Sequence, residues 1–144
     1  QSQRIAGALR ALSVMASPIT NALATRWIQN GTLHTVRNQQ RELSRQRQRR
    51  ARQVLGHLHP VANEDGFHLW LPLPASLPVN PSDVAVFLRN HGISAVSSAA
   101  FCTDNNPPQA MRMCLCGPVG LRELEQRLNL LRDVLQENVN FTMI

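Results

Sequence analysis

The sequence contains no lysine, so all fifteen of its basic residues are arginine. This absence excludes covalent chemistry through a lysine amine and makes every basic side chain a permanent cation. The three cysteines are odd in number and lack the spacing of a disulfide framework, which favours reduced thiols and a cytoplasmic location. No apolar run is long enough to span a bilayer and no signal peptide opens the chain, so we expect no membrane partner.

The patterns of the common catalytic and metal sites are also missing. The sequence has no Gly-x-Ser-x-Gly elbow, no glycine-rich phosphate loop and no clear pair of carboxylates. Cys114 and Cys116 form half of a metal site at most, and packing as small apolar residues is the favoured interpretation. We therefore predict no catalytic residue and no metal site in this chain.

The composition is that of a globular domain. The chain has 144 residues, of which 43% are hydrophobic and 17% charged, enough to bury a core. Its net charge of +6 is compatible with nucleic acid or an acidic partner. Because the chain begins at Gln1 without a methionine, we expect it to be part of a longer protein.

Helical spacing dominates residues 1–58. Apolar residues recur at helical intervals over residues 4–15, and again after Ser17 and Pro18, which are typical of the N-cap and first position of a helix. Gly31 is typical of a helix end, and Thr32 of the cap of a third helix to about residue 58. The apolar stripe expected for this long helix is sparse and consists of Val36, Leu43, Val54 and Leu58, with Ala51 and Leu55 beside it.

Residues 59–144 combine strands with helices. Alternation starting at Phe67 predicts a strand with Phe67, Leu69 and Leu71 on one face, and further strands are expected at residues 93–96 and 109–117. Asn80 or Ser82 begins a short helix that Gly92 closes, and a leucine repeat predicts a final helix over residues 121–135. The predicted fold is α+β, a small mostly antiparallel sheet covered by helices, in a single domain of residues 1–144.

Five arginines of the long helix form a ladder on one helical face: Arg37, Arg41, Arg45, Arg49 and Arg52. Basic helix faces bind phosphates, so direct nucleic-acid binding is one interpretation. No aromatic residues are interleaved with the arginines, and no helix-turn-helix, zinc-finger or RNA-recognition pattern is present. A solvated or partner-facing helix face is the favoured interpretation.

Arg112 stands out because it lies within the apolar stretch QAMRMCLCG, residues 109–117. Strand alternation puts Met111, Met113 and Leu115 on one face. It puts Arg112, Cys114 and Cys116 on the other. A guanidinium fixed on a sheet is suited to pair with a carboxylate through two parallel hydrogen bonds. The alternative is a strand-edge arginine that reaches solvent, and the residues alone favour this alternative.

Four phrases in chain order resemble a known family: residues 16–31 (ASPITNALATRWIQNG), 65–74 (DGFHLWLPLP), 93–101 (ISAVSSAAF) and 111–118 (MRMCLCGP). They resemble the C-terminal part of class I aminotransferase-like domains, which are fold type I pyridoxal-phosphate proteins. The first two phrases look most like the MocR-type branch of the GntR transcriptional regulators. In that branch a winged-helix DNA-binding domain precedes the aminotransferase-like domain.

The resemblance implies that Arg112 binds the α-carboxylate of an amino-compound effector or substrate. It implies a cofactor, pyridoxal phosphate, held in the parent protein by a lysine of a large domain outside this chain, so none is expected on this fragment. It also implies a homodimeric parent that binds DNA through an N-terminal domain. Relatives often carry Pro-Gly where this chain has Ser97 and Ser98, so the shape of that loop is not carried over.

Three functions follow as hypotheses. The first is the effector-sensing small domain of a MocR-type regulator, which we favour. The second is the small domain of a true pyridoxal-phosphate aminotransferase, in which case only the parent protein would be an enzyme. The third is direct nucleic-acid binding through the arginine ladder.

Overall fold

The structure is a computed structural model that describes residues 2–12, 17–75 and 79–136. Two compact units divide the chain, Gln1–Gln40 and Arg41–Ile144. The first unit is helical, and the second contains the sheet. None of the helices within the described ranges is long and apolar enough to cross a membrane.

The first unit contains α1 (Ser2–Leu12), α2 (Pro18–Gln29) and the beginning of α3 (Thr32–Leu55). Pro18 opens α2 as predicted, with Ser17 as N-cap residue, although the Ser17 side chain makes no capping hydrogen bond. Gly31 adopts a left-handed φ of 79°, which confirms that the chain turns there. Thr32 is the first residue of α3 and not its cap, because the Asn30 side chain accepts a hydrogen bond from the Thr32 amide at 3.0 Å. The predicted end of the first helix at Met15 lies outside the described residues.

The apolar stripes of this unit are exposed. No described residue of α2 is buried, and Ile19 is 81% exposed. In α3 the sparse stripe is only partly covered, because Val36 and Leu43 are exposed and burial begins at Ser44. The buried positions of α3 are Ser44, Gln48, Ala51, Val54 and Leu55. Two polar side chains therefore take the place expected for an apolar residue in the middle of the helix.

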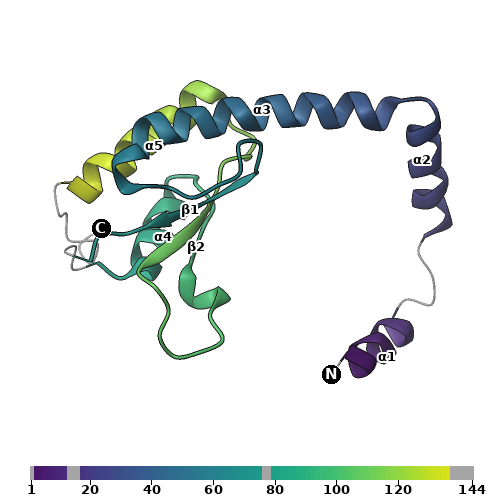
Figure 1. The fold of residues 1–144 in the computed structure, drawn as a ribbon, viewed down its shortest axis with the longest axis horizontal. Coiled ribbons are helices and arrows are strands. Elements are labelled where there is room, and N and C mark those ends of the chain that lie inside the picture. Colours follow the sequence, from purple (N-terminus) through teal and green to yellow (C-terminus); the bar gives the residue numbers. More distant parts are fainter. Residues whose placement is uncertain (1, 13–16, 76–78, 137–144) are drawn as a thin grey trace. The chain divides into compact units, whose positions relative to one another are not determined.

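The second unit holds a three-stranded sheet in the order β1-β3-β2, with both strand pairs antiparallel (Figure 1). Its strands are β1 (His68–Pro72), β2 (Ala95–Ser97) and β3 (Ala110–Cys114). Helices α4 (Pro81–Asn90) and α5 (Leu121–Gln136) accompany them. Two short 3₁₀ helices complete the unit, η1 (Gly56–Leu58) and η2 (Ser98–Phe101). The predicted α+β class with a small antiparallel sheet and flanking helices is confirmed.

Local boundaries differ from the predictions in instructive ways. Phe67 precedes β1 and is 49% exposed, so it does not share the buried face of Leu69 and Leu71. Asn80, and not Ser82, caps α4, because the Asn80 side chain accepts a hydrogen bond from the Ser82 amide at 2.8 Å. The long helix ends at Leu55, three residues early, where the chain tightens into η1.

The hydrophobic core lies on one face of the sheet. Met111 and Met113 of the central strand are fully buried there, as the alternation predicted, with Leu69 and Leu71 of β1. They form one cluster with residues from three helices: Ala51, Val54 and Leu55 of α3, Val84 and Leu88 of α4, and Leu124, Leu128 and Leu131 of α5. Because the helices cover this face, the opposite face of β3 is left partly open around Arg112.

Candidate functional site

Arg112 lies at the centre of the sheet. It pairs in register with Trp70 of β1 and with Val96 of β2. All three side chains are partly buried and stand on the face opposite the core. The sheet therefore fixes the backbone of Arg112 from both sides, so its side chain projects from a rigid position.

The guanidinium of Arg112 lies over an aromatic ring. Its central carbon is 4.6 Å from the centroid of Phe101, a cation–π geometry. Trp70 meets the same ring edge-on, with centroids 6.1 Å apart and planes at 65°. Within the described ranges the Arg112 side chain has no hydrogen bond or ion pair, so the planar fork has its N–H donors free.

Two serines shape the loop that carries Phe101. Ser98 is buried and its hydroxyl donates to the carbonyl of Pro108 at 2.5 Å. The Ser97 hydroxyl accepts from the Ala99 amide at 3.3 Å at the start of η2. These bonds hold a short 3₁₀ turn, and Phe101 at its end contacts the guanidinium of Arg112. Sequence reasoning missed this role of Phe101, because the contact joins a loop to a strand.

A broad hollow of about 630 Å³ adjoins the same loop. Ser97, Ser98 and Ala99 line one part of it, and residues 79–82 and 106–109 line the rest. None of its lining side chains is charged, and Arg112 is not among them. The hollow offers polar surface beside the loop but no group that would anchor an anion.

Much of the arginine ladder is engaged within the protein. Arg41 donates to a carboxylate oxygen of Asp65 at 2.7 Å, and Arg45 lies 3.9 Å from the same oxygen. That hydrogen bond, with the charges of Arg41 and Arg45, lowers the pKa of Asp65 below its ordinary value. Arg49 contacts Glu42 at 3.3 Å, and Arg52 donates to a backbone carbonyl. The ladder is therefore not a bare cationic face.

Arg47 was not singled out in the sequence because it lies outside the ladder's spacing. Its guanidinium donates to the carbonyls of Leu115 and Val119, each at 2.6 Å, and to that of Gly117 at 3.3 Å. One side chain of α3 thus fastens the connection between β3 and α5. Arg47 and these carbonyls are separated by 68 to 72 residues along the chain, so local sequence spacing does not reveal the contact.

The three cysteines, Cys102, Cys114 and Cys116, are free thiols. Cys116 lies beyond the end of β3 and its sulfur is 3.6 Å from the Ser44 hydroxyl of α3. The predicted shared face of Arg112 and the cysteines therefore ends at Cys114. Across the part of the chain that the structure describes, no three His, Cys, Asp or Glu residues are grouped to hold a metal ion.

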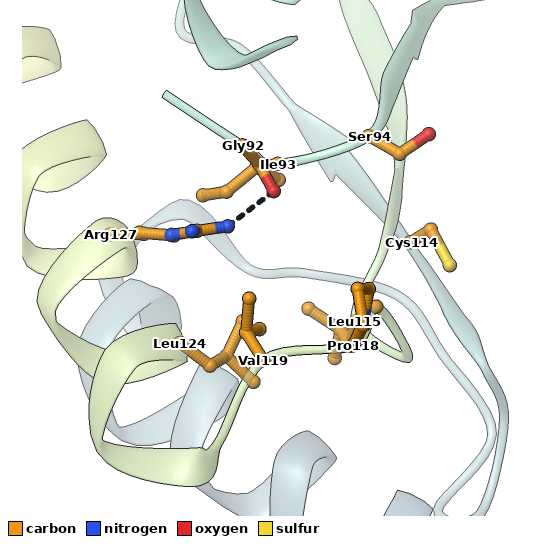
Figure 2. A pocket seen from close by; sticks show the side chains of 10 residues that line it. Gly92, Ile93, Ser94, Cys114, Leu115, Pro118, Val119, Leu124 and Arg127 are labelled. Carbon is orange, nitrogen blue, oxygen red and sulfur yellow. Dashed lines mark hydrogen bonds between the residues drawn. The ribbon is translucent and has the colours of Figure 1, made fainter. Parts of the chain in front are cut away.

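A second, smaller hollow of about 120 Å³ lies where β3 leads into α5 (Figure 2). Figure 2 shows Arg127 reaching across it to the carbonyl of Gly92, a hydrogen bond of 2.5 Å. Arg127 also pairs with Glu123. Its charge is therefore balanced, and the rest of the lining is mostly apolar, including Ile93, Leu115 and Leu124. Arg127 is the charged residue of the described lining, and it is already engaged by the Gly92 carbonyl and Glu123.

The fold and the open arginine-bearing face define a small α+β domain that presents a cation from its central strand. Over 134 residues the chain is 26% identical to a Bacillus subtilis (strain 168) protein described as an uncharacterized HTH-type transcriptional regulator, YdeF. The match covers 92% of this chain but only 29% of that protein, so the chain spans less than a third of its length. No family model and no solved structure matches. The chain is thus similar to part of a transcriptional regulator.

Proposed function

We propose that this chain is the C-terminal effector-binding part of a transcriptional regulator of the MocR-type branch of the GntR family. Arg112 would bind the carboxylate of an amino-compound effector. The observation that carries the proposal is the free guanidinium of Arg112 on the central strand, held over Phe101. The similarity to part of an HTH-type regulator supports the regulatory role.

The surroundings of Arg112 suit a carboxylate. Arginine presents parallel N–H donors in a plane, and a carboxylate accepts them as a pair. Phe101 lies against the face of the guanidinium and Trp70 meets the same ring edge-on, so aromatic contacts orient the fork. Since no described carboxylate already occupies the guanidinium, a ligand does not have to displace one.

The cofactor does not fit this chain by itself. With no lysine among the 144 residues, the chain lacks the amine that would hold pyridoxal phosphate as a Schiff base. In the proposal a large domain elsewhere in the parent holds the cofactor, and this chain is the small domain that closes on the effector. The parent would be a cytoplasmic homodimer whose N-terminal domain binds DNA. Closure on the effector would shift the equilibrium between its open and closed conformations, and the DNA-binding domain would respond to that shift.

The test uses the complete parent protein loaded with pyridoxal phosphate. Amino acids and their decarboxylated amines are titrated as paired probes, with cofactor absorbance as the readout. Arg112→Ala should lower the affinity for amino acids by about tenfold or more, because a charge-assisted pair with the carboxylate is lost. The amines should bind as before, since they lack the group that Arg112 holds.

Arg50→Ala is the matched control, because Arg50 is also a partly buried arginine of the second unit but pairs with Glu125. It should leave both probe series unchanged. If the Arg112→Ala variant bound amino acids as tightly as the unmodified parent protein does, the assignment of Arg112 would be refuted. Sustained turnover of amino acids to keto acids would instead favour the aminotransferase alternative.

A further inference from the structure

A third hollow, of about 270 Å³, lies on α3 away from Arg112. Five residues line it: Arg45, Gln48, Arg49, Arg52 and Glu64. The three arginines recur at intervals of four and three residues, so α3 presents them along one side. All five belong to the second unit, and none takes part in the proposed carboxylate site.

Most donors of these arginines are unused. Among the described residues, Arg45 makes only long ion-pair contacts, 3.8 Å to Glu42 and 3.9 Å to Asp65. Arg49 donates once to Glu42 at 3.3 Å, and Arg52 once to a backbone carbonyl at 2.8 Å. Each guanidinium carries five N–H groups, so three forks remain largely free to bind an anion.

Gln48 contributes a buried acceptor. Its side chain is 1% exposed, and its Nε2 donates to the carbonyls of Gly66 and His68 at 2.8 and 3.0 Å. These two bonds fix the orientation of the amide. Its Oε1 is buried with no hydrogen-bond partner in the described structure. A buried acceptor without a donor is uncommon in native proteins and calls for a partner.

We propose that this hollow binds a small protonated phosphate, with inorganic phosphate as the simplest member. The guanidinium groups of Arg45, Arg49 and Arg52 would donate to the charged oxygens. Gln48 Oε1 would accept from the remaining P–O–H group, and Glu64 offers a second acceptor. The requirement for a donor on the anion distinguishes phosphate from sulfate, which carries no proton near neutral pH.

The same chemistry disfavours a nucleic-acid backbone at this place. A phosphodiester has no proton to donate to Gln48 Oε1. Glu42, Glu64 and Asp65 lie at or beside the arginines, and their charges repel an extended polyanion. A compact hollow with mixed charge therefore favours one small ligand over a strand of phosphates.

The experiment is a calorimetric titration of the 144-residue chain with inorganic phosphate near neutral pH, repeated with sulfate at equal ionic strength. Phosphate should bind saturably. Sulfate should bind at least about fivefold more weakly, because Gln48 Oε1 stays unpaired in the sulfate complex. Arg49→Gln should lower the affinity for phosphate by about tenfold, because charge-assisted hydrogen bonds are lost. The Arg49 side chain is 66% exposed, so the substitution should preserve the fold, which thermal unfolding verifies.

Arg37→Gln is the control, because Arg37 belongs to the same ladder but does not line the hollow. It should change the phosphate affinity by less than about twofold. Equal binding of phosphate and sulfate, or equal losses in the two variants, would overturn the proposal. Binding of a duplex DNA that added phosphate does not displace would also overturn the proposal. That result would favour nucleic-acid binding by the arginine ladder. The comparison of the two anions on the unmodified chain decides the matter without any variant.

Discussion

The guanidinium of Arg112 stacks on the ring of Phe101, with 4.6 Å between the guanidinium carbon and the ring centroid. Phe101 belongs to the 3₁₀ turn η2, eleven residues before Arg112 in the chain. The contact orients the fork without consuming its N–H donors, because the ring interacts with the face of the guanidinium. A ligand can therefore meet an arginine that is already positioned.

This stacking predicts a measurable coupling energy. Phe101→Leu and Arg112→Met, alone and together, should give a coupling of about 0.5–1 kcal/mol in the free energy of unfolding, as expected for a half-exposed cation–π pair. Chemical denaturation of the four proteins measures it. Phe67→Leu is the control, because Phe67 is similarly exposed but no ring contact joins it to Arg112. A coupling no larger than that of the Phe67 cycle would contradict the stacking.

Arg47→Met should destabilise the second unit. The substitution keeps an apolar stem but removes charged hydrogen bonds to the carbonyls of Leu115 and Val119. We expect a loss of about 2 kcal/mol in the free energy of unfolding, seen as a lower denaturant midpoint. Arg50→Met, which removes a surface ion pair with Glu125, should cost less than about 1 kcal/mol. Equal losses for both variants would mean that the Arg47 bonds contribute no more than a surface pair.

Asp65 predicts a pH dependence of stability. The Arg41 hydrogen bond, with the charges of Arg41 and Arg45, lowers its pKa from the ordinary 3.8. Because the unfolded pKa is higher, the ionised carboxylate stabilises the folded state above about pH 3.8. This contribution is lost as the pH falls through the lower folded pKa.

Asp65→Asn should therefore be less stable than the unmodified chain near neutral pH, and the two should converge in acid. Denaturation at a series of pH values measures the difference. Asp83→Asn makes the same charge change at an exposed position of α4, where no arginine bond is lost. If the Asp65→Asn difference stayed constant down to about pH 2, the linkage to its pKa would be refuted.

Gly92→Ala should destabilise the end of α4. Gly92 has a φ of 76°, a left-handed conformation that is unfavourable for alanine. A methyl group there would also meet the guanidinium of Arg127 and displace it from the Gly92 carbonyl (Figure 2). We expect a cost of about 1–2 kcal/mol in thermal or chemical unfolding. Gly56→Ala, where the added methyl meets open space, should change stability by less than about 1 kcal/mol in either direction.

The sequence by itself determined the local elements and the two faces of the central strand. Alternation around Arg112 predicted that Met111 and Met113 would be buried and that the arginine would face away from them, and both statements hold. Helix punctuation worked equally well at Pro18 and Gly31. These features succeed because they depend on neighbours within a few residues, where backbone geometry is fixed by residue type.

Only the tertiary structure decided which partners the charged groups meet. Arg41 bonds to Asp65 from 24 residues away, and Arg47 bonds to a carbonyl 68 residues away. Gln48 took the buried position in α3 because the carbonyls of Gly66, before β1, and of His68, the first residue of β1, approach it there. Such contacts depend on how loops close and how helices pack on the sheet, and the order of residues alone does not specify them. The sequence supplied the arginines, and the packing of α3 on the sheet determined which groups Arg41, Arg47 and Arg52 bond within the protein.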